Sequence, residues 1–402
     1  MKTVAVIAEY NPFHMGHAYQ LQKIKEAFGE DAALIVIMSG NFVQRGTPAI
    51  LGKFDRARMA VDCGASLVLE LPFPFSSASA EYFAGAGVSI VNDLGVVDVL
   101  SFGSECGKTE LLLDVAEKMQ REDFVQVLHE RLTSKEEKSK GYPRVLTEAF
   151  LDFYGSNFPE NLFLPNNILA ISYLSALKKM HSTIVPHTVY RSGTDEDAGA
   201  DTVLAGATYL RGLFFSGKTD EAFSHLPAMT HQRWKDMIAC GLAPVSDKAL
   251  SPLLLAHLRI DPFPEKVPAD CGGGVLRLLK KAAIEARDLD ELYANTSTKK
   301  YPAARLRRAT LFSYFGVTPA NIKAKPLYTQ VLAMDEKGQR ILANIRKTAN
   351  ISLLTKPADL HKLSSAARLQ AELSYRADSV YTLLSPCPEK ASIFLRTGPY
   401  RK

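Results

Sequence analysis

Short apolar runs alternate with helical patterns along the first half of the chain. The runs are rich in β-branched residues, which favours strands, whereas apolar residues that recur every three or four positions are typical of amphipathic helices. The pattern predicts strands at residues 3–8, 33–38, 66–71, 96–102 and 183–190. Helices are predicted between and after them, at residues 18–28, 54–63, 80–92, 109–121 and 166–180.

This alternation predicts an α/β fold, with an open and mostly parallel sheet that helices cover on both faces. Sheets of this kind bind ligands at the carboxyl ends of their strands. After about residue 218 the strand signal fades, and helical patterns are interrupted by prolines and by the glycines at 272–274. We therefore expect two domains: residues 1–218 with the sheet, and residues 219–402 as a mainly α-helical C-terminal domain.

The composition is that of an ordinary soluble protein, with 47% hydrophobic and 23% charged residues in 402. The first apolar run meets Glu9 and Asn11 too early for a signal peptide, and no run reaches the roughly 18 apolar residues of a membrane span. We expect a cytoplasmic protein that has no membrane partner. The five cysteines are odd in number and lack CxxC spacing, so neither a disulfide framework nor a metal site is indicated.

Charge is distributed unevenly along the chain. Residues 1–218 carry a net charge of −6, and residues 219–402 carry +11. Within the second half, residues 299–347 hold 11 Lys and Arg but only two acidic residues. Such a surface is suited to contact with the phosphates of a nucleic acid.

The strongest local motif is His14-Met15-Gly16-His17, directly after the first predicted strand. Gly16 allows the chain to enter the following helix closely, and the helix N-terminus offers free N–H groups and a partial positive charge. The two imidazoles can add donors to the same anion, whereas a metal-binding pair on a helix is more often spaced His-x-x-x-His. The motif therefore predicts a cradle for a polyphosphate.

This segment resembles the HxGH nucleotidyltransferase superfamily, and within it the bacterial tRNA(Met) cytidine acetate ligase family. The resemblance extends from AEYNPFHMGH at 8–17 through MSGNFVQRG at 38–46, ELP at 70–72, SFGSE at 101–105 and PNNILA at 165–170. It covers the first 215 residues closely and the remainder more loosely. The resemblance implies a Rossmann-like nucleotidyltransferase domain.

The resemblance also implies a two-step reaction. Acetate attacks the α-phosphorus of ATP, which gives acetyl-adenylate and pyrophosphate, and the N4 amine of the wobble cytidine of elongator tRNA(Met) then takes the acetyl group. The product is N4-acetylcytidine. His14 and His17 are the implied catalytic residues, ATP is a substrate together with acetate, and Mg²⁺ is expected to accompany ATP. No tightly bound cofactor and no obligate protein partner are expected.

The implied ATP site leaves two details open. Gly206 stands where the family usually has a serine, and the resemblance leaves open whether Asn166 or Asn167 contacts the nucleotide, since Asn166 could instead cap the helix that follows. The ATP-binding residues implied by the resemblance are Ile7, Ala8, Glu9, Tyr10, Asn11, Pro12, Phe13, His14, Met15, Gly16, His17, Ala18, Tyr19, Gln20, Gly103, Asn166, Asn167, Arg191, Thr208 and Arg211.

Two further groups of polar residues are candidates for binding. The first group follows the second predicted strand and consists of Gln44, Arg45, Lys53 and Arg56. From this position we expect that some of the four side chains neutralise pyrophosphate or orient acetate. The second group resembles a basic segment of the family that leads into a helix, with Pro302 in place of a threonine, and it is expected to bind tRNA; its members are Lys299, Lys300, Tyr301, Arg305, Arg307 and Arg308.

Two other functions are compatible with parts of the sequence. A small-molecule adenylyltransferase of the same superfamily would use the His14–His17 motif, but it would not need a long basic second half. A non-catalytic RNA-binding protein would use that half, but it would not need His14, Gly16, His17 and Arg211 to be intact.

Overall fold

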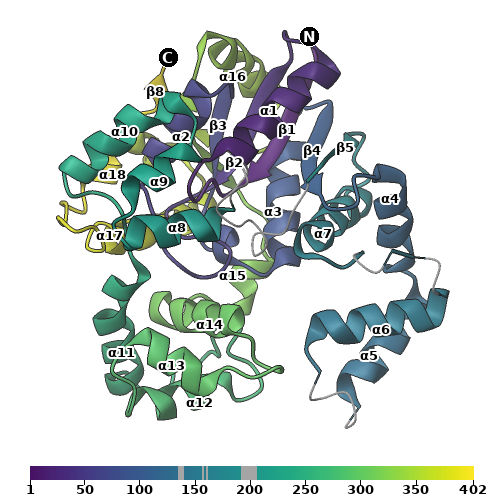
Figure 1. Cartoon of the computed structure of the whole chain (residues 1–402), viewed down its shortest axis with the longest axis vertical. Helices are drawn as coiled ribbons and strands as arrows, with labels where there is room; N and C mark the ends of the chain where they lie inside the picture. The colour runs from purple at the N-terminus through teal and green to yellow at the C-terminus, as the bar shows by residue number, and fades with distance from the viewer. Residues whose placement is uncertain (135–139, 156–157, 160–161, 192–205) are drawn as a thin grey trace.

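One twisted sheet organises the described residues, which are 1–134, 140–155, 158–159, 162–191 and 206–402 of the computed structural model (Figure 1). The strand order is β5-β4-β1-β2-β3-β6-β7, and β8 pairs with β6. All pairings are parallel except that between β3 and β6. The strands are β1 (Thr3–Ala8), β2 (Ala33–Ser39), β3 (Leu67–Leu71), β4 (Val99–Ser104), β5 (Val185–Tyr190), β6 (Tyr328–Met334), β7 (Ser352–Leu354) and β8 (Tyr400–Arg401).

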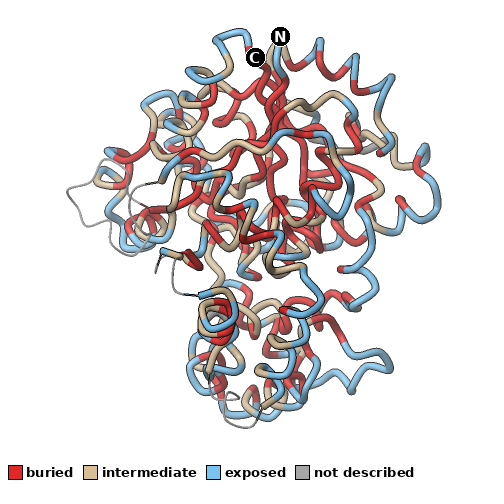
Figure 2. The backbone as a smooth tube through the Cα atoms, turned by 90° about the vertical axis from the view of Figure 1, so that its right-hand side faces the viewer, coloured by how far each residue is buried: buried red, intermediate tan, exposed pale blue. Residues whose placement is uncertain are grey.

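Helices cover both faces of the sheet, as the apolar runs predict. Every residue of β2 is buried, and alternate positions of β1, β2 and β3 enter two separate cores. One core packs against α3 (Ala80–Asp93), α4 (Thr109–Lys118), α7 (Pro165–Lys179) and α16 (Glu336–Thr348). The other packs against α1 (Met15–Phe28), α2 (Lys53–Asp62), α8 (Ala207–Phe215), α9 (Thr219–Ser224) and α10 (Ala228–Ala239). Figure 2 shows the buried backbone concentrated in this sheet.

The five predicted strands and five predicted helices are confirmed, with ends that shift by a few residues. The helix predicted at 18–28 begins earlier, at Met15, because His14 caps it. The helix predicted at 109–121 ends at Lys118. The α/β class with its mostly parallel open sheet is therefore confirmed.

A separate helical lobe lies below the sheet on one side in Figure 1. Its core is formed mainly by α11 (Ser251–Ile260), α12 (Val275–Ala283), α13 (Leu289–Thr296) and α14 (Ala303–Phe315). On the other side in Figure 1 lies a hairpin of α5 (Glu122–Thr133) and α6 (Tyr142–Tyr154). No helix of the described residues is long and apolar enough to cross a membrane.

The structure modifies the two-domain division expected at residue 218. The second half is mainly helical, but β6, a fully buried strand, pairs antiparallel with β3 and extends the sheet. After the short α15 (Pro319–Lys323), the chain thus returns to the sheet through β6, α16, β7 and β8 and packs α17 (Ser365–Tyr381) and α18 (Ile393–Arg396) beside it. The physical reason is that β3 would otherwise be an open edge, with unpaired N–H and C=O groups.

Candidate active site

A cavity of about 750 Å³ opens at the carboxyl ends of β1, β4 and β5. Most of the residues that the sequence predicts for ATP line it, as do Gln44 and Arg45 from the acetate and pyrophosphate group. The predicted residues that line the cavity are Ile7, Ala8, Glu9, Tyr10, Asn11, His14, Gly16, His17, Tyr19, Gln20, Gln44, Arg45, Gly103, Asn166, Arg191, Thr208 and Arg211.

The histidines of the motif form a reciprocal cap at the start of α1. The Gly16 N–H donates to His14 Nδ1 at 3.0 Å, and the His14 N–H donates to His17 Nδ1 at 3.3 Å. Because each Nδ1 accepts a hydrogen bond, each neutral imidazole carries its hydrogen on Nε2. The Nε2 atom of His14 is buried and has no hydrogen-bond partner within the described chain, although His14 lines the cavity. A ligand acceptor would satisfy it.

Both imidazoles are neutral at physiological pH. Burial, together with the nearby charges of Arg191 and Arg211, lowers the pKa of His14 to about 3. Burial and the neighbouring His14 also lower the pKa of His17 well below its ordinary value. The site therefore offers N–H donors from these rings, and its positive charge comes from arginine and from the helix N-terminus.

Gly16 is required by the conformation of His14. A Cβ atom at residue 16 would lie 2.9 Å from His14 Cε1 and 3.1 Å from His14 Nδ1. The imidazole thus folds back over the space that any other side chain would occupy. The absence of a side chain at Gly16 therefore leaves room for the His14 ring as well as for an approaching phosphate.

Arg211 connects α8 to the loop after β1. Its guanidinium donates to the backbone oxygen of Asn11 at 2.7 Å and to Thr208 Oγ1 at 3.1 Å. Gly206 begins α8 without a side-chain cap. These contacts hold Arg211 and Thr208 at the cavity wall that faces the α1 N-terminus, where a phosphate would bind both.

The two neighbouring asparagines have different positions. Asn167 is fully buried, and its Oδ1 accepts hydrogen bonds from the N–H groups of Glu105 and Cys106. Asn166 lines the cavity, donates to Glu105 Oε1 and accepts from Arg191 Nη1 at 3.2 Å. The structure therefore brings Asn166, and not Asn167, to the cavity, beside Gly103 at the end of β4.

The structure corrects the hypothesis for Lys53 and Arg56, which do not line the cavity. Lys53 is 1% exposed, and its Nζ contacts Glu70 Oε1 at 2.8 Å and Asp378 Oδ2 at 2.7 Å. Arg56 is fully buried and donates to four backbone carbonyls, those of Leu51, Glu9, Ser39 and Gly40. Both side chains extend from α2 into the protein interior, where they join β1, β2, β3 and α17.

Besides Asn167, four residues of the predicted ATP set lie outside the cavity lining, namely Pro12, Phe13, Met15 and Ala18. Phe13 is fully buried and contacts the rings of Tyr10 and His17, so it supports the loop from behind. Sequence reasoning missed eleven lining residues, several of them apolar side chains whose only sequence signal is their place in a strand or helix: Val43, Thr47, Ala80, Phe83, Phe102, Pro165, Leu169, Tyr173, Val189, Tyr190 and Ala207.

A tight turn forms another wall of the cavity. Phe42 and Pro48 form an isolated bridge, and the Val43 N–H donates to the Thr47 oxygen at 3.0 Å. The Gln44 N–H donates to Glu9 Oε1 at 2.8 Å, which attaches the turn to the loop after β1. Burial raises the pKa of Glu9, while the charges of Arg211, Arg45 and Arg56 oppose that shift.

The predicted tRNA-binding residues gather around the N-terminus of α14. Lys299 and Lys300 are exposed, and Arg307 lies over the Tyr293 ring at 5.5 Å. The other three are partly engaged within the lobe: Arg308 pairs with Asp270 at 2.6 Å, and Arg305 and Tyr301 donate to carbonyls of the turn at 270–273. Their cationic groups thus share one region, but they are not equally available to a ligand.

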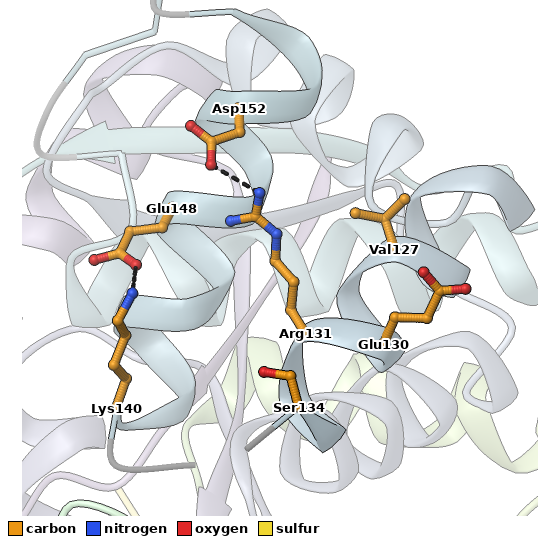
Figure 3. A pocket seen from close by; sticks show the side chains of 7 residues that line it. All are labelled: Val127, Glu130, Arg131, Ser134, Lys140, Glu148 and Asp152. Carbon is orange, nitrogen blue, oxygen red and sulfur yellow. Dashed lines mark hydrogen bonds and ion pairs between the residues drawn. The ribbon is translucent and has the colours of Figure 1, made fainter. Parts of the chain in front are cut away.

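A second hollow, of about 660 Å³, lies on the α5–α6 hairpin, and Figure 3 shows its side chains. Lys140 pairs with Glu148 at 2.5 Å, and Arg131 pairs with Asp152 at 2.8 Å. None of the predicted site residues lies here. Among the residues that the structure describes, no group of three His, Cys, Asp or Glu is placed to hold a metal ion.

Comparison with known proteins agrees with this geometry. A family model described as HIGH Nucleotidyl Transferase matches residues 1–393. A tRNA(Met) cytidine acetate ligase of Acetivibrio thermocellus is 32% identical over 401 residues, which cover 95% of each chain. Another, of Halothermothrix orenii, is 32% identical and covers 97% of this chain and 96% of its own.

Solved structures show the same fold over the whole length. The Thermotoga maritima protein TmcAL, in a crystal structure with alpha-thio ATP bound, is 28% identical with a TM-score of 0.90, and the match covers 100% of this chain and 99% of that one. Its apo form is 29% identical with a TM-score of 0.93, over 100% of both chains. From the motif, the cavity and these full-length matches, the chain belongs to the HIGH nucleotidyl transferase family, among the tRNA(Met) cytidine acetate ligases.

Proposed function

We propose that this ATP-dependent ligase activates acetate as acetyl-adenylate and transfers the acetyl group to the N4 amine of the wobble cytidine of elongator tRNA(Met). The relatives named above carry the tRNA substrate in their names, and the T. maritima structure contains an ATP analogue. The proposal extends both substrates to this chain and adds acetate as the third.

The observation that carries the proposal is the buried Nε2 of His14 at the N-terminus of α1, which has no hydrogen-bond partner among the residues that the structure describes. Attack of acetate on the α-phosphorus increases negative charge on the phosphate oxygens, and donors that are already positioned stabilise it without reorganisation. His14 Nε2 and the Arg211 guanidinium meet that need, beside the positive end of the α1 dipole. Because the imidazoles are neutral, they act by hydrogen bonding.

The lining also suggests how ATP lies. Phe83, Phe102 and Tyr173 provide an apolar wall beside Gly103 and Asn166, which suits a purine and its ribose. The polar wall around His14, Arg211 and Thr208 suits the triphosphate. We propose that Mg²⁺ enters with the nucleotide, since this ion is commonly bound through substrate phosphates and water.

The exposed lysines before α14 are the proposed first contact for tRNA. A sugar-phosphate backbone binds cations by a salt-dependent interaction that carries no sequence information. We further propose that the protein acts in the cytoplasm, where tRNA and ATP are present.

The test is an assay of purified protein with ATP, radiolabelled acetate and elongator tRNA(Met), followed by digestion to nucleosides. The expected product is labelled N4-acetylcytidine. The matched control is the same tRNA with uridine at the wobble position, which has no exocyclic amine and should remain unlabelled. Absence of label in both RNAs, with ATP binding intact, would contradict the proposal and favour a small-molecule adenylyltransferase.

A further inference from the structure

The turn that lines the cavity contacts the basic helix of the other lobe. Gly46 lies at its tip with φ of 74°, and a Cβ atom there would lie 2.7 Å from the backbone nitrogen of Arg308 and 2.9 Å from the carbonyl carbon of Arg307. Backbone thus meets backbone between the turn and α14. The wall formed by Val43, Gln44 and Thr47 is therefore the part of the cavity that lies next to the predicted RNA surface.

The same turn is attached to a carboxylate inside the cavity. Gln44 donates its N–H to Glu9 Oε1, and Glu9 directly follows β1. A short series of contacts therefore leads from α14 through Gly46 and Gln44 to Glu9. Glu9 is the sole Asp or Glu among the described residues that line the cavity.

The histidines of the site are poorly suited to accept a proton. His14 Nδ1 and His17 Nδ1 already accept hydrogen bonds, at 3.0 and 3.3 Å, and each Nε2 carries the hydrogen. They can donate to phosphate, but neither has an available lone pair on the ring. Glu9 Oε1 accepts one N–H, so the carboxylate retains acceptor capacity, since two oxygens offer about four lone-pair positions.

We propose that Glu9 is the general base of acetyl transfer, a role that rests on the proposed function. The amine nitrogen of cytidine attacks the carbonyl carbon of acetyl-adenylate and forms the N–C bond. The bond between that carbon and the phosphate oxygen breaks, and AMP leaves with its electron pair. The proton lost by the nitrogen passes to a Glu9 oxygen, so the products are N4-acetylcytidine, AMP and a protonated Glu9.

Several charged and titratable groups face Glu9. Arg45 lies on the turn, Arg56 on α2 and Arg211 on α8, and Tyr173 reaches it from α7. Burial raises the pKa of Glu9 and outweighs the opposing arginine charges. A base whose pKa lies nearer to the working pH accepts a proton more effectively than an ordinary carboxylate.

The experiment measures the two half-reactions of Glu9→Gln separately. Acetyl-adenylate formation is followed without RNA, by trapping the labelled acetyl group of acetyl-adenylate with hydroxylamine as acetohydroxamate, which releases AMP. Transfer is followed in a single turnover, by mixing enzyme that carries labelled acetyl-adenylate with excess tRNA at a series of pH values upward from 4.5, the ordinary pKa of a glutamate. Glutamine keeps the acceptor for the Gln44 N–H, so the turn retains its attachment.

We expect Glu9→Gln to slow acetyl transfer by at least about 100-fold relative to wild type. The loss in transfer should be at least tenfold larger than the loss in acetyl-adenylate formation. The wild-type transfer rate should rise as Glu9 deprotonates with increasing pH and then level off, and the Gln variant should lack this rise. Glu9→Asp should keep the pH dependence at a reduced rate, which provides the test if the Gln variant unfolds.

Glu389→Gln is the matched control, because burial also raises the pKa of Glu389 while this residue lies outside the cavity lining. It should change neither half-reaction. Equal losses in both half-reactions of Glu9→Gln would show that Glu9 only supports the turn, and transfer within threefold of wild type would overturn the proposal. A wild-type enzyme that forms no acetylcytidine would instead refute the proposed function itself, before any variant is compared.

Discussion

The imidazole of His14, a residue that lines the cavity, fills the space beside residue 16, and its buried Nε2 has no hydrogen-bond partner among the described residues. This single conformation depends on a glycine that has no unusual φ angle, so its requirement is steric and local. This steric dependence also explains why the two histidines and the glycine together indicate a binding site more strongly than any one of them does alone. Two predictions follow at the scale of single residues.

Gly16→Ala should displace the His14 ring, because the new Cβ atom would lie 2.9 Å from Cε1. We expect ATP affinity to fall at least tenfold while the fold remains stable, since alanine favours a helix over glycine by about 1 kcal/mol. Calorimetric titration with ATP and thermal unfolding check the two parts. Gly85→Ala, in helix α3 with no atom within 4 Å of the new methyl group, is the control. Unchanged ATP affinity in Gly16→Ala would contradict the steric argument.

The buried neutral state of His14 should make stability depend on pH. Its folded pKa of about 3 lies below its ordinary 6.5, so the unfolded chain binds a proton first as the pH falls. The contribution of this residue is fully present above pH 6.5 and decreases by about 1 kcal/mol between pH 6.5 and 5.5. Urea unfolding at both values should therefore show a larger loss for wild type than for His14→Gln. Equal losses would mean that the ring is protonated in the folded protein.

At the scale of elements, the first five strands and their helices follow from local patterns of apolar and β-branched residues. Strands β1 to β4 are buried along nearly their whole length, whereas β5 is exposed at both ends. β6 was not predicted, since YTQVLAM mixes polar and apolar residues and is buried only by its pairing with β3. The direction in which a side chain points likewise depends on tertiary packing that the local sequence does not show. Lys53 and Arg56 follow β2 closely in sequence, as a binding residue would, and only the orientation of α2 turns them toward the interior.

Lys53 joins three elements, because its Nζ contacts Glu70 of β3 and Asp378 of α17 while the residue begins α2. Lys53→Met should remove the cation and leave two carboxylates buried without it. We expect the free energy of unfolding to fall by about 3–5 kcal/mol, measured by urea denaturation. Lys178→Met, whose partner Glu117 is exposed, should leave stability nearly unchanged. A small effect at Lys53 would mean that the carboxylates are neutral in the folded protein.

For the whole molecule, the cavity that we propose for the nucleotide and the basic surface lie on different cores but touch at Gly46. The sequence indicates both regions by motif and by charge, yet no local signal indicates that they meet. Because we propose that ATP and RNA bind in different regions, substitution should separate the two functions. Substitutions on the basic surface should alter RNA affinity and leave the groups around His14 unchanged.

Replacement of Lys299 and Lys300 by alanine should weaken tRNA binding and reduce the slope of log affinity against log salt concentration by about 1 to 2. Both side chains are exposed and lie outside the cavity lining. Filter binding at several salt concentrations gives the slope, and titration with ATP should give the wild-type affinity. The pair Lys178 and Lys179, at the end of α7 away from the cavity, is the matched double-alanine control. An unchanged slope would place the RNA elsewhere.

The antiparallel pairing of β3 with β6 also affects how the chain is made. Leu67 pairs with Met334, so roughly 270 further residues must be synthesised before this edge of the sheet acquires its partner. At about 5–20 residues per second, the delay is on the order of 10 to 50 seconds. During that time the nascent chain carries an apolar strand edge, and an open edge of this kind is a site of aggregation. Folding of the catalytic sheet is therefore completed late in synthesis, and a chaperone that covers β3 would increase the yield of active protein.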